Sequence, residues 1–183
     1  MQPLDASALG DAYRRQLSTQ DYAPVKQIDG VEILQLRQMM DDGGDFMEVA
    51  RVSPEGELLA RPGMRVSQVN YSRVLPGAVK AFHLHFNQED VWFVPPTDRL
   101  LVGLLDVRQD SPTYEQRMRL VLGGGQTRML YIPRGVAHGV ANLWQQPAVL
   151  MYFVNQQFSL DEPDERRLPS DLCGPDFWSI HPG

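Results

Sequence analysis

Three of the four histidines stand where their imidazoles can work together. His83 and His85 lie two residues apart in a run, residues 79–86, that has the pattern of a β-strand. Because side chains alternate between the two faces of a strand, both imidazoles are predicted to point into one space. His138 follows a Pro-Gly turn, whereas His181 lies near the end of the chain and is predicted to be solvated. Imidazoles titrate near neutral pH, so such a cluster can move protons or bind a metal.

The spacing around these histidines resembles the two signature motifs of the cupin family. In the first motif, five residues separate Gly77 from His83, and three separate His85 from Glu89. The second motif reads Pro133-x-Gly135-x-x-His138-x-x-x-Asn142. In many cupins the matching side chains bind one divalent metal. The resemblance therefore implies an alternative site for Fe, Mn, Ni or Zn, made of His83, His85, Glu89 and His138.

Short strands separated by turns must hold these residues in place. The β-like runs cover residues 31–36, 46–50, 65–74, 79–86, 91–94, 100–107, 116–122, 129–132 and 148–154. Proline, glycine and aspartate mark the turns between nearly all of them. The gaps are too short for the crossover helices of a parallel sheet, so the pattern predicts an all-β sandwich or barrel.

Both ends of the chain differ from this pattern. Leu9, Tyr13 and Leu17 recur every four residues, which predicts a helix over residues 5–17 with one apolar stripe. The tail after Phe158 is polar and proline-punctuated, and we expect it to lie on the barrel and end near Phe177 and Trp178. The prediction is a single domain, residues 1–183, made of an N-terminal extension (1–28), a barrel (29–158) and a C-terminal extension (159–183).

Composition narrows the class of protein. The chain has 183 residues, 43% of them apolar, and a formal net charge of −6. That charge argues against a general nucleic-acid binder, which needs clustered Lys and Arg. Cys173 is the single cysteine, the start of the chain has no signal-peptide pattern, and the longest apolar run, residues 148–154, is too short to cross a bilayer. We therefore expect a cytoplasmic protein with no membrane contact.

Several segments resemble dTDP-4-dehydrorhamnose 3,5-epimerase and its relatives, which are non-metal enzymes on the cupin fold. The similar stretch runs from about Gly30 to Trp178, and its common order and spacing make the match specific. The matching segments are residues 41–48, 68–72, 80–83, 106–113 and 131–139. The resemblance implies a double-stranded β-helix, or jelly roll, with isomerase activity on a 4-keto-deoxy sugar nucleotide. It implies no cofactor.

The resemblance also implies roles for particular residues. His83 would be the general base that removes the acidic proton beside the ketone, and Tyr152 would return a proton on the opposite face. The enolate formed between these steps needs donors or a cation, for which Lys80 and His138 are candidates. His85 lies beside the base. Glu48, Gln68 and Asn70 match positions that contact the substrate or its nucleotide, partly across the interface of a homodimer.

The chain departs from the family pattern at cationic positions. Gly43 and Lys80 stand where arginines are expected, Asp90 stands near the position of an expected lysine, and His85 is a second histidine. The acidic partner of the base histidine has no assignment in the sequence. Strict alternation would also place Lys80 on the strand face opposite His83.

Other readings of these residues remain open from the sequence. Tyr152, Phe82 and Trp92 fit a plain core, Gln68 and Asn70 fit a solvated face, and Asp106 with Arg108 fits a structural ion pair. As whole functions, the alternatives are a sugar-nucleotide 3,4-ketoisomerase, a metal-dependent cupin and a non-catalytic sugar-binding cupin. Dimerisation is expected by resemblance, and pairing would cover the edge strands of such a barrel.

Overall fold

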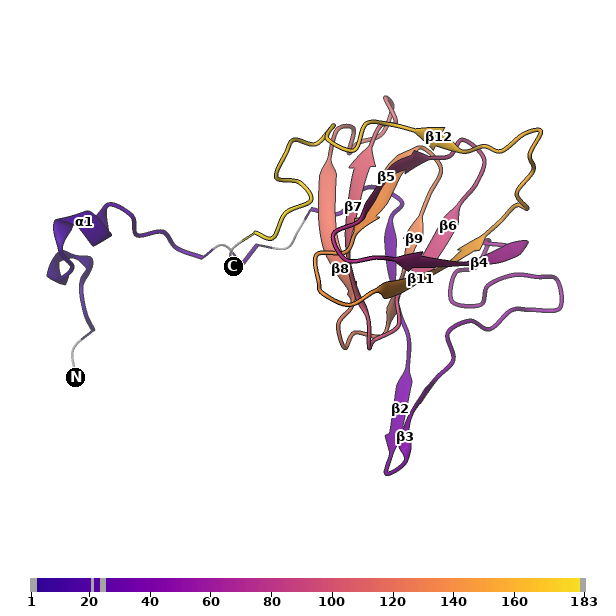
Figure 1. Cartoon of the computed structure of the whole chain (residues 1–183), viewed down its shortest axis with the longest axis horizontal. Coiled ribbons are helices and arrows are strands. Elements are labelled where there is room, and N and C mark those ends of the chain that lie inside the picture. Colours follow the sequence, from indigo (N-terminus) through magenta and orange to yellow (C-terminus); the bar gives the residue numbers. More distant parts are fainter. Residues whose placement is uncertain (1–2, 21, 24–25, 182–183) are drawn as a thin grey trace.

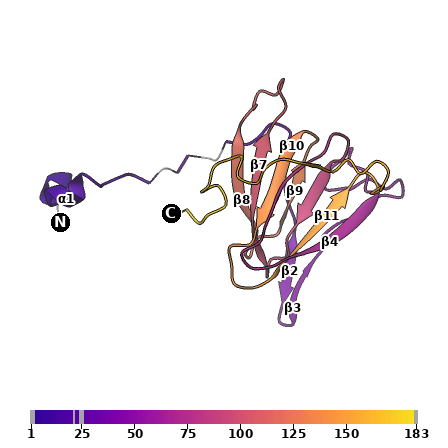
Figure 2. The same cartoon turned by 45° about the horizontal axis from the view of Figure 1, so that its top comes forward.

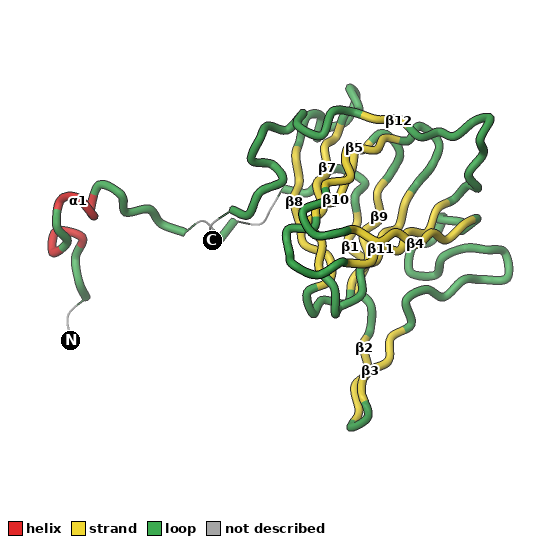
Figure 3. Tube along the Cα trace, in the orientation of Figure 1, coloured by secondary structure: helices red, strands yellow, loops and turns green. Residues whose placement is uncertain are grey.

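The computed structural model describes residues 3–20, 22–23 and 26–181. Two five-stranded antiparallel sheets face each other (Figures 1 and 3). In order across the first sheet, the strands are β1 (Glu32–Gln35), β9 (Arg128–Ile132), β6 (Asp90–Phe93), β11 (Ala148–Val154) and β4 (Gln68–Val74). Across the second they are β12 (Arg166–Arg167), β5 (Val79–Leu84), β10 (Val136–Ala141), β7 (Arg99–Asp106) and β8 (Arg117–Gly123). This arrangement is the predicted all-β jelly roll.

The main core fills the space between the sheets. Its members come from the inward faces of strands in both sheets, among them Trp92, Leu130, Val102, Leu104 and Val140. Each alternates with residues on the outer faces, as strand geometry requires. The cavity described below opens within this layer, so the residues that hold the two sheets together also set its walls.

The C-terminal tail covers the outer face of the second sheet. There Phe177 and Cys173 pack against Phe82, Leu105 and Ala137. Gly103 of β7 makes this contact possible, because a Cβ at that position would lie 2.4 Å from Cε1 of Phe177. Seven of the eight residues of β7 are buried, since the core covers one face and the tail the other. The expected docking of the tail near Phe177 and Trp178 is confirmed.

A hairpin of β2 (Gln38–Asp41) and β3 (Gly44–Met47) projects from the barrel (Figure 1). The predicted strand over residues 46–50 overlaps β3, but no strand was predicted at β2. Strands β10 and β12 were not predicted either. In β10 the break in the apolar pattern is Gly139, where a Cβ would lie 2.3 Å from the Cβ of Ala81, so glycine permits a close approach of two strands.

The predicted N-terminal helix over residues 5–17 is wrong in extent. A 3₁₀ turn, Ala6–Ala8, precedes a single α-helical turn, α1 (Asp11–Arg14). Gly10 separates them with an extended ψ of 146°. Figures 1 and 2 show α1 standing apart from the barrel, and its Tyr13 is exposed. With no surface to cover, the apolar repeat has nothing to stabilise a longer helix. No described helix is long and apolar enough to cross a membrane.

Candidate active site

A cavity of about 570 Å³ opens between the two sheets. Its walls hold most of the residues singled out from the sequence. The first sheet contributes Ser72, Asp90, Trp92, Leu150 and Tyr152; the second contributes Val79, Lys80, Ala81, His83, His138, Val140 and Arg167; and His85, Gln88, Phe158 and Glu165 come from the adjoining segments. His83, Tyr152, His85, His138 and Lys80 are therefore brought together, as predicted.

Strand β5 and the residue after it present the two histidines to the cavity. His83 and His85 line it, while Phe82 and Leu84 face the other way, into the cluster under the C-terminal tail. On β10, His138 lies directly opposite His83, and the two rings stack with centroids 6.1 Å apart. The alternation predicted from the sequence is confirmed over this stretch.

Lys80 is an exception to the predicted alternation, which placed it on the strand face opposite His83. The pairing of β5 with β10 shifts between two positions: His138 lies opposite His83, but Val140 lies opposite Lys80. One more residue therefore stands on β5 than on β10, which is a β-bulge. The extra residue brings Lys80 to the same side as His83, where its Nζ donates to Oγ of Ser72 at 2.9 Å.

His83 has an acidic partner that the sequence did not identify. Its Nδ1 lies 2.5 Å from Oε1 of Glu165, and its Nε2 accepts from Nη1 of Arg167 at 2.8 Å. Because arginine can only donate, Nε2 carries the lone pair and Nδ1 carries the proton. Burial raises the pKa of Glu165, but the hydrogen bond and charge of His83 outweigh it and hold that pKa below its usual value.

The turn of the tail that carries Glu165 is itself anchored to the end of β5. The Asp164 carboxylate accepts from the backbone N–H groups of Phe86, Asn87 and Gln88 at 2.8–3.0 Å. Its backbone carbonyl accepts from Nδ1 of His85 at 2.6 Å. These contacts join positions nearly 80 residues apart in the chain, and no local periodicity in the sequence signals them.

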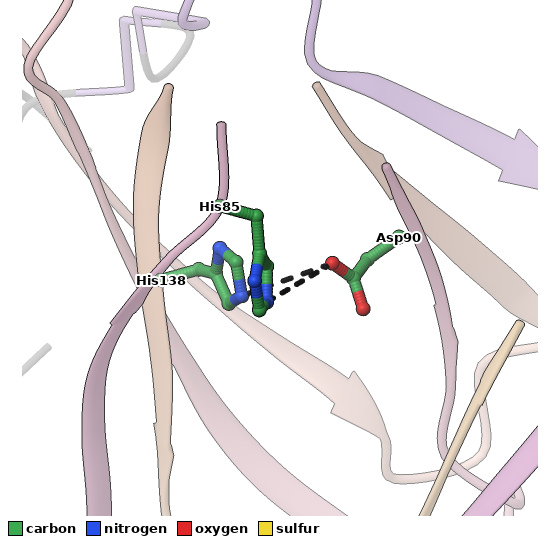
Figure 4. Close-up of side chains that lie close together, drawn as sticks. All are labelled: His85, Asp90 and His138. Atoms are coloured by element: carbon green, nitrogen blue, oxygen red, sulfur yellow. Dashed lines mark ion pairs between the residues drawn. The ribbon is translucent and has the colours of Figure 1, made fainter. Parts of the chain in front are cut away.

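The floor of the cavity holds a second cluster, formed by His85, Asp90 and His138 (Figure 4). Nδ1 of His138 donates to the carbonyl of Val136 at 2.8 Å, as Nδ1 of His85 does to Asp164. Both Nε2 atoms therefore carry a lone pair. They point toward Oδ2 of Asp90, at 3.7 Å from His85 and 3.9 Å from His138. Three acceptors converge, and the Gln88 amide donates to two of them, His85 and Asp90, at 3.2–3.4 Å.

Burial controls the ionisation of this cluster. All three side chains are under 5% exposed. Burial raises the pKa of Asp90 despite the opposing pull of His85. Burial lowers the pKa of His138 to about 3, so His138 is neutral at pH 7. A neutral His138 whose Nε2 carries no hydrogen cannot donate to an enolate, which leaves Lys80 as the candidate donor of the predicted pair.

The donor set fits a small cation, with two corrections to the predicted ligands. His83 lies outside the set, because its two ring nitrogens bond Glu165 and Arg167. The ligand atoms of His85, Asp90 and His138 all lie within 4.8 Å of one another. Ligands on a bound divalent metal stand about 3.4 Å apart, so a slight contraction of this triangle would close it. Glu89 is not part of it, because it points to Arg134 with a 3.6 Å separation. Strand β6 starts at Asp90, and that shift of one residue turns Glu89 away.

Tyr152 reaches the cavity from β11, in the sheet opposite His83. It packs against the core and is half-buried. Burial, with the charges of Asp90 and Glu165, raises the pKa of its hydroxyl, so it keeps its proton at neutral pH. No hydrogen bond joins this hydroxyl to another described residue, so it is open to a group bound in the cavity.

Three predicted substrate-binding residues lie outside the cavity lining. Gln68 and Asn70 are on the edge strand β4, joined by a 2.6 Å hydrogen bond, and Gln68 also accepts from the backbone of Phe158. Glu48 follows the projecting hairpin, is exposed, and pairs with Arg51 at 2.5 Å. Within one chain these side chains do not reach His83.

Some of the residues with a structural alternative in the sequence do have a structural role. Asp106 and Arg108 form an ion pair at 2.8 Å, and Phe82 is fully buried in the cluster under the tail. Trp92 is core and also lines the cavity, where its Nε1 donates to Asp90 at 3.3 Å. His181 is exposed and contacts Arg119.

Comparison with known proteins identifies the family. The family model of dTDP-4-dehydrorhamnose 3,5-epimerase matches residues 25–170. The Bacillus subtilis spore coat polysaccharide biosynthesis protein SpsL is 39% identical over 144 residues, 79% of this chain and 91% of that protein. The dTDP-4-dehydrorhamnose 3,5-epimerase of Bacillus anthracis, solved with TDP and pyrophosphate, gives a TM-score of 0.68 at 25% identity, covering 87% of this chain and 91% of that one.

A further solved relative is the 3,5-epimerase of Legionella pneumophila in complex with dTDP-4-keto-L-rhamnose. Its TM-score is 0.67 at 26% identity, with 79% of this chain and 76% of that chain covered. The chain therefore belongs to the dTDP-4-dehydrorhamnose 3,5-epimerase family and is a sugar-nucleotide epimerase, an isomerase.

Proposed function

We propose that the cavity binds a dTDP-linked 4-keto-6-deoxy sugar and inverts a carbon beside its ketone, with His83 as base and Tyr152 as acid. The single observation that carries the proposal is that His83 and Tyr152 line one cavity from opposite sheets. Inversion needs a base on one face of the carbon and an acid on the other. The ligands of the Bacillus anthracis and Legionella pneumophila relatives support the substrate class.

His83 is suited to the first step. Its Nε2 lone pair takes the proton from the carbon beside the ketone, and the electron pair moves onto the ketone oxygen to form an enolate. The Glu165 carboxylate, bonded to Nδ1, fixes the tautomer and stabilises the imidazolium that results.

Tyr152 is suited to the second step. Its hydroxyl donates a proton to the opposite face of the same carbon, and the enolate returns to the ketone. His83 then gives its proton to water and Tyr152 regains one, which restores the enzyme. Lys80 lines the cavity and is the candidate of the predicted pair to balance the enolate charge, since His138 has no hydrogen on Nε2.

The test is proton exchange in D2O with protein stripped of metal and a dTDP-4-keto-6-deoxy sugar. Mass spectrometry follows deuterium uptake at the carbons beside the ketone. We expect uptake by the wild type and a loss of about 10²–10⁴-fold in His83→Ala. Tyr152→Phe is expected to keep uptake from the first proton transfer but to lose the inverted product.

His181→Ala is the matched control, because His181 is exposed and outside the cavity. Equal loss in both histidine variants would contradict a specific role for His83. Product analysis separates the neighbouring reaction: transfer of the keto group between carbons, with no inversion, would indicate a 3,4-ketoisomerase and overturn the proposal. Binding of the sugar nucleotide with no exchange would indicate a non-catalytic binder.

A second candidate function is metal-assisted isomerisation, which is favoured by the convergence of His85, Asp90 and His138. A divalent cation there would supply Lewis-acid stabilisation of an oxyanion. Our preferred reading needs no cofactor. Elemental analysis of the purified protein, together with exchange rates before and after chelation, decides between the two. Rates that fall on chelation and return with Fe, Mn, Ni or Zn would favour the metal.

We further propose that the chain works as a cytoplasmic homodimer of single-domain subunits. Apolar side chains that are at least half exposed support the dimer: Val69 and Tyr71 on edge strand β4, and Met40 and Phe46 on the projecting hairpin. Such a dimer would bring Glu48, Gln68 and Asn70 toward a partner's nucleotide. Light scattering of the wild type and of Tyr71→Glu tests it, and a monomeric wild type would contradict it.

The proposed cytoplasmic location is supported by the lone thiol, Cys173, which suits a reducing compartment.

A further inference from the structure

We propose that Arg167 is the receptor for the diphosphate of the substrate and that it covers the lone pair of His83 until such an anion binds. Binding of the diphosphate would draw the guanidinium away and free the base. The inference deepens the proposed function and rests on it for the identity of the base. It concerns a residue that the sequence reading did not single out.

The contacts of Arg167 occupy the base. Nη1 donates to Nε2 of His83 at 2.8 Å, and Nη2 lies 3.1 Å from Oε1 of Glu165. The same guanidinium thus holds both members of the pair. A lone pair that accepts a hydrogen bond from arginine cannot accept a proton from carbon at the same time, so catalysis requires Arg167 to move.

The surroundings of Arg167 allow that movement. Its side chain is 58% exposed, and its strand β12 is only two residues long. Arginine binds phosphate through two parallel charge-assisted hydrogen bonds to an anion, whereas it makes a single bond to the neutral imidazole of His83. A diphosphate at the cavity mouth can therefore compete with the neutral imidazole for the guanidinium.

The charges of the cavity point to Arg167 as the anion receptor. Of the described residues that line the cavity, Lys80 and Arg167 are the two lysine or arginine side chains. The ammonium of Lys80, held by Ser72 and the carbonyl of Arg73, is the candidate to balance the enolate, which leaves Arg167 for the diphosphate. Arginine offers a planar fork that binds phosphate in a bidentate way. TDP and pyrophosphate in the Bacillus anthracis relative show that this fold accepts such anions.

Arg166 provides a matched control on the same strand. It lies opposite Leu84, whereas Arg167 lies opposite His83. Its guanidinium stands over the ring of Phe86, 5.7 Å from the centroid, and it does not line the cavity. Arg166→Gln removes the same charge from the neighbouring position and leaves the base contact intact.

The first experiment needs no turnover. Calorimetry measures the binding of dTDP and of thymidine to the wild type, Arg167→Gln, Arg167→Lys and Arg166→Gln. We expect Arg167→Gln to weaken dTDP at least tenfold and thymidine hardly at all, with partial recovery in Arg167→Lys and wild-type values in Arg166→Gln. Unchanged dTDP affinity in Arg167→Gln would overturn the proposal.

The second readout follows the base itself. In protein labelled with ¹⁵N-histidine, loss of the Arg167 bond changes the Nε2 resonance of His83. Inorganic pyrophosphate or dTDP is expected to shift that resonance in the wild type. Arg167→Gln is expected to show the shifted resonance without any ligand. If neither the ligand nor the substitution changes the Nε2 resonance of His83, Arg167 does not cover the base.

Kinetics separate this inference from the proposed function. In the deuterium assay, Arg167→Gln is expected to raise KM at least tenfold while kcat stays within about threefold. A wild type with no exchange, but with the expected dTDP and NMR results, would refute the catalytic proposal and keep the anion receptor. Normal exchange with an unchanged KM in Arg167→Gln would refute the anion receptor alone.

Discussion

Asp106 and Asp90 are both buried aspartates in the barrel, but they differ in the hydrogen-bond donors that surround their carboxylates. Asp106, at the end of β7, is 0% exposed and accepts from Arg108, Ser111 and Thr113 at 2.5–3.1 Å. Asp90, at the start of β6, is 2% exposed, and its nearest donors, on Gln88 and Trp92, stand 3.3–3.4 Å away.

The pKa values follow from this difference in donors. Burial raises the pKa of Asp106, but the hydrogen bonds of Arg108, Ser111 and Thr113 outweigh it and hold that pKa well below its usual range. At Asp90 burial dominates and the pKa rises. A carboxylate with all its partners built in stabilises a turn, whereas one that lacks them faces the cavity and is available for a proton, a cation or a substrate group.

The largest predicted effect on stability is at the well-paired site. Asp106→Asn removes the charge that Arg108 and two hydroxyls surround, and we expect the free energy of unfolding to fall by about 3 kcal/mol. Urea denaturation measures it, with the exposed Asp110→Asn as the control. Exchange activity per folded molecule should stay near the wild-type value, because Asp106 does not line the cavity.

Glu165 is a third carboxylate, between these extremes, and its effect should be on catalysis. Glu165→Gln can still accept from His83 but no longer stabilises the imidazolium by charge. We expect kcat for deuterium exchange to fall about 10²–10⁴-fold. Glu162→Gln, an exposed change in the same tail, should leave it unaltered. Full activity in Glu165→Gln would refute the dyad.

The cavity floor should also set how stability responds to acid. His138 has a pKa of about 3 in the folded protein and its ordinary value of 6.5 when unfolded. Between these values the unfolded chain binds a proton that the folded protein does not, so stability is lost as pH falls. We expect a slope of up to about 1.4 kcal/mol per pH unit from this residue.

Urea denaturation between pH 6.5 and about 4, with chelator present, measures this slope in the wild type and in His138→Gln. Asp106 contributes little in that window, because its ordinary pKa is 3.8 and its folded value is lower still. Equal slopes in the two proteins would mean that His138 takes up its proton equally in the folded and unfolded states.

The smallest predicted change tests the other side of the comparison. Asp90→Asn removes a buried charge that is poorly compensated, so at pH 7 the free energy of unfolding should change by less than about 1 kcal/mol or increase. The same urea measurement, set beside Asp106→Asn, makes the contrast direct. A loss as large as that of Asp106→Asn would show that Asp90 is a structural carboxylate.

Much of the barrel and part of the cavity could be read from the residues alone. Runs of alternating or apolar residues located nine of the strands, because a strand between two layers has a strong local pattern. The same alternation placed His83 and His85 on one face, motif spacing added His138, and the family resemblance added Tyr152. The ion pair of Asp106 and Arg108 was also anticipated, since its partners are two residues apart.

The remaining features were decided by tertiary structure, because they join distant parts of the chain. Glu165 and Arg167 reach His83 across more than 80 residues, in a polar tail whose local sequence resembles any solvated extension. A one-residue bulge put Lys80 into the cavity, and a one-residue shift at the start of β6 chose Asp90 over Glu89. Periodicity predicts which faces a strand has. Register and long-range packing decide which side chains meet, and both depend on the fold as a whole.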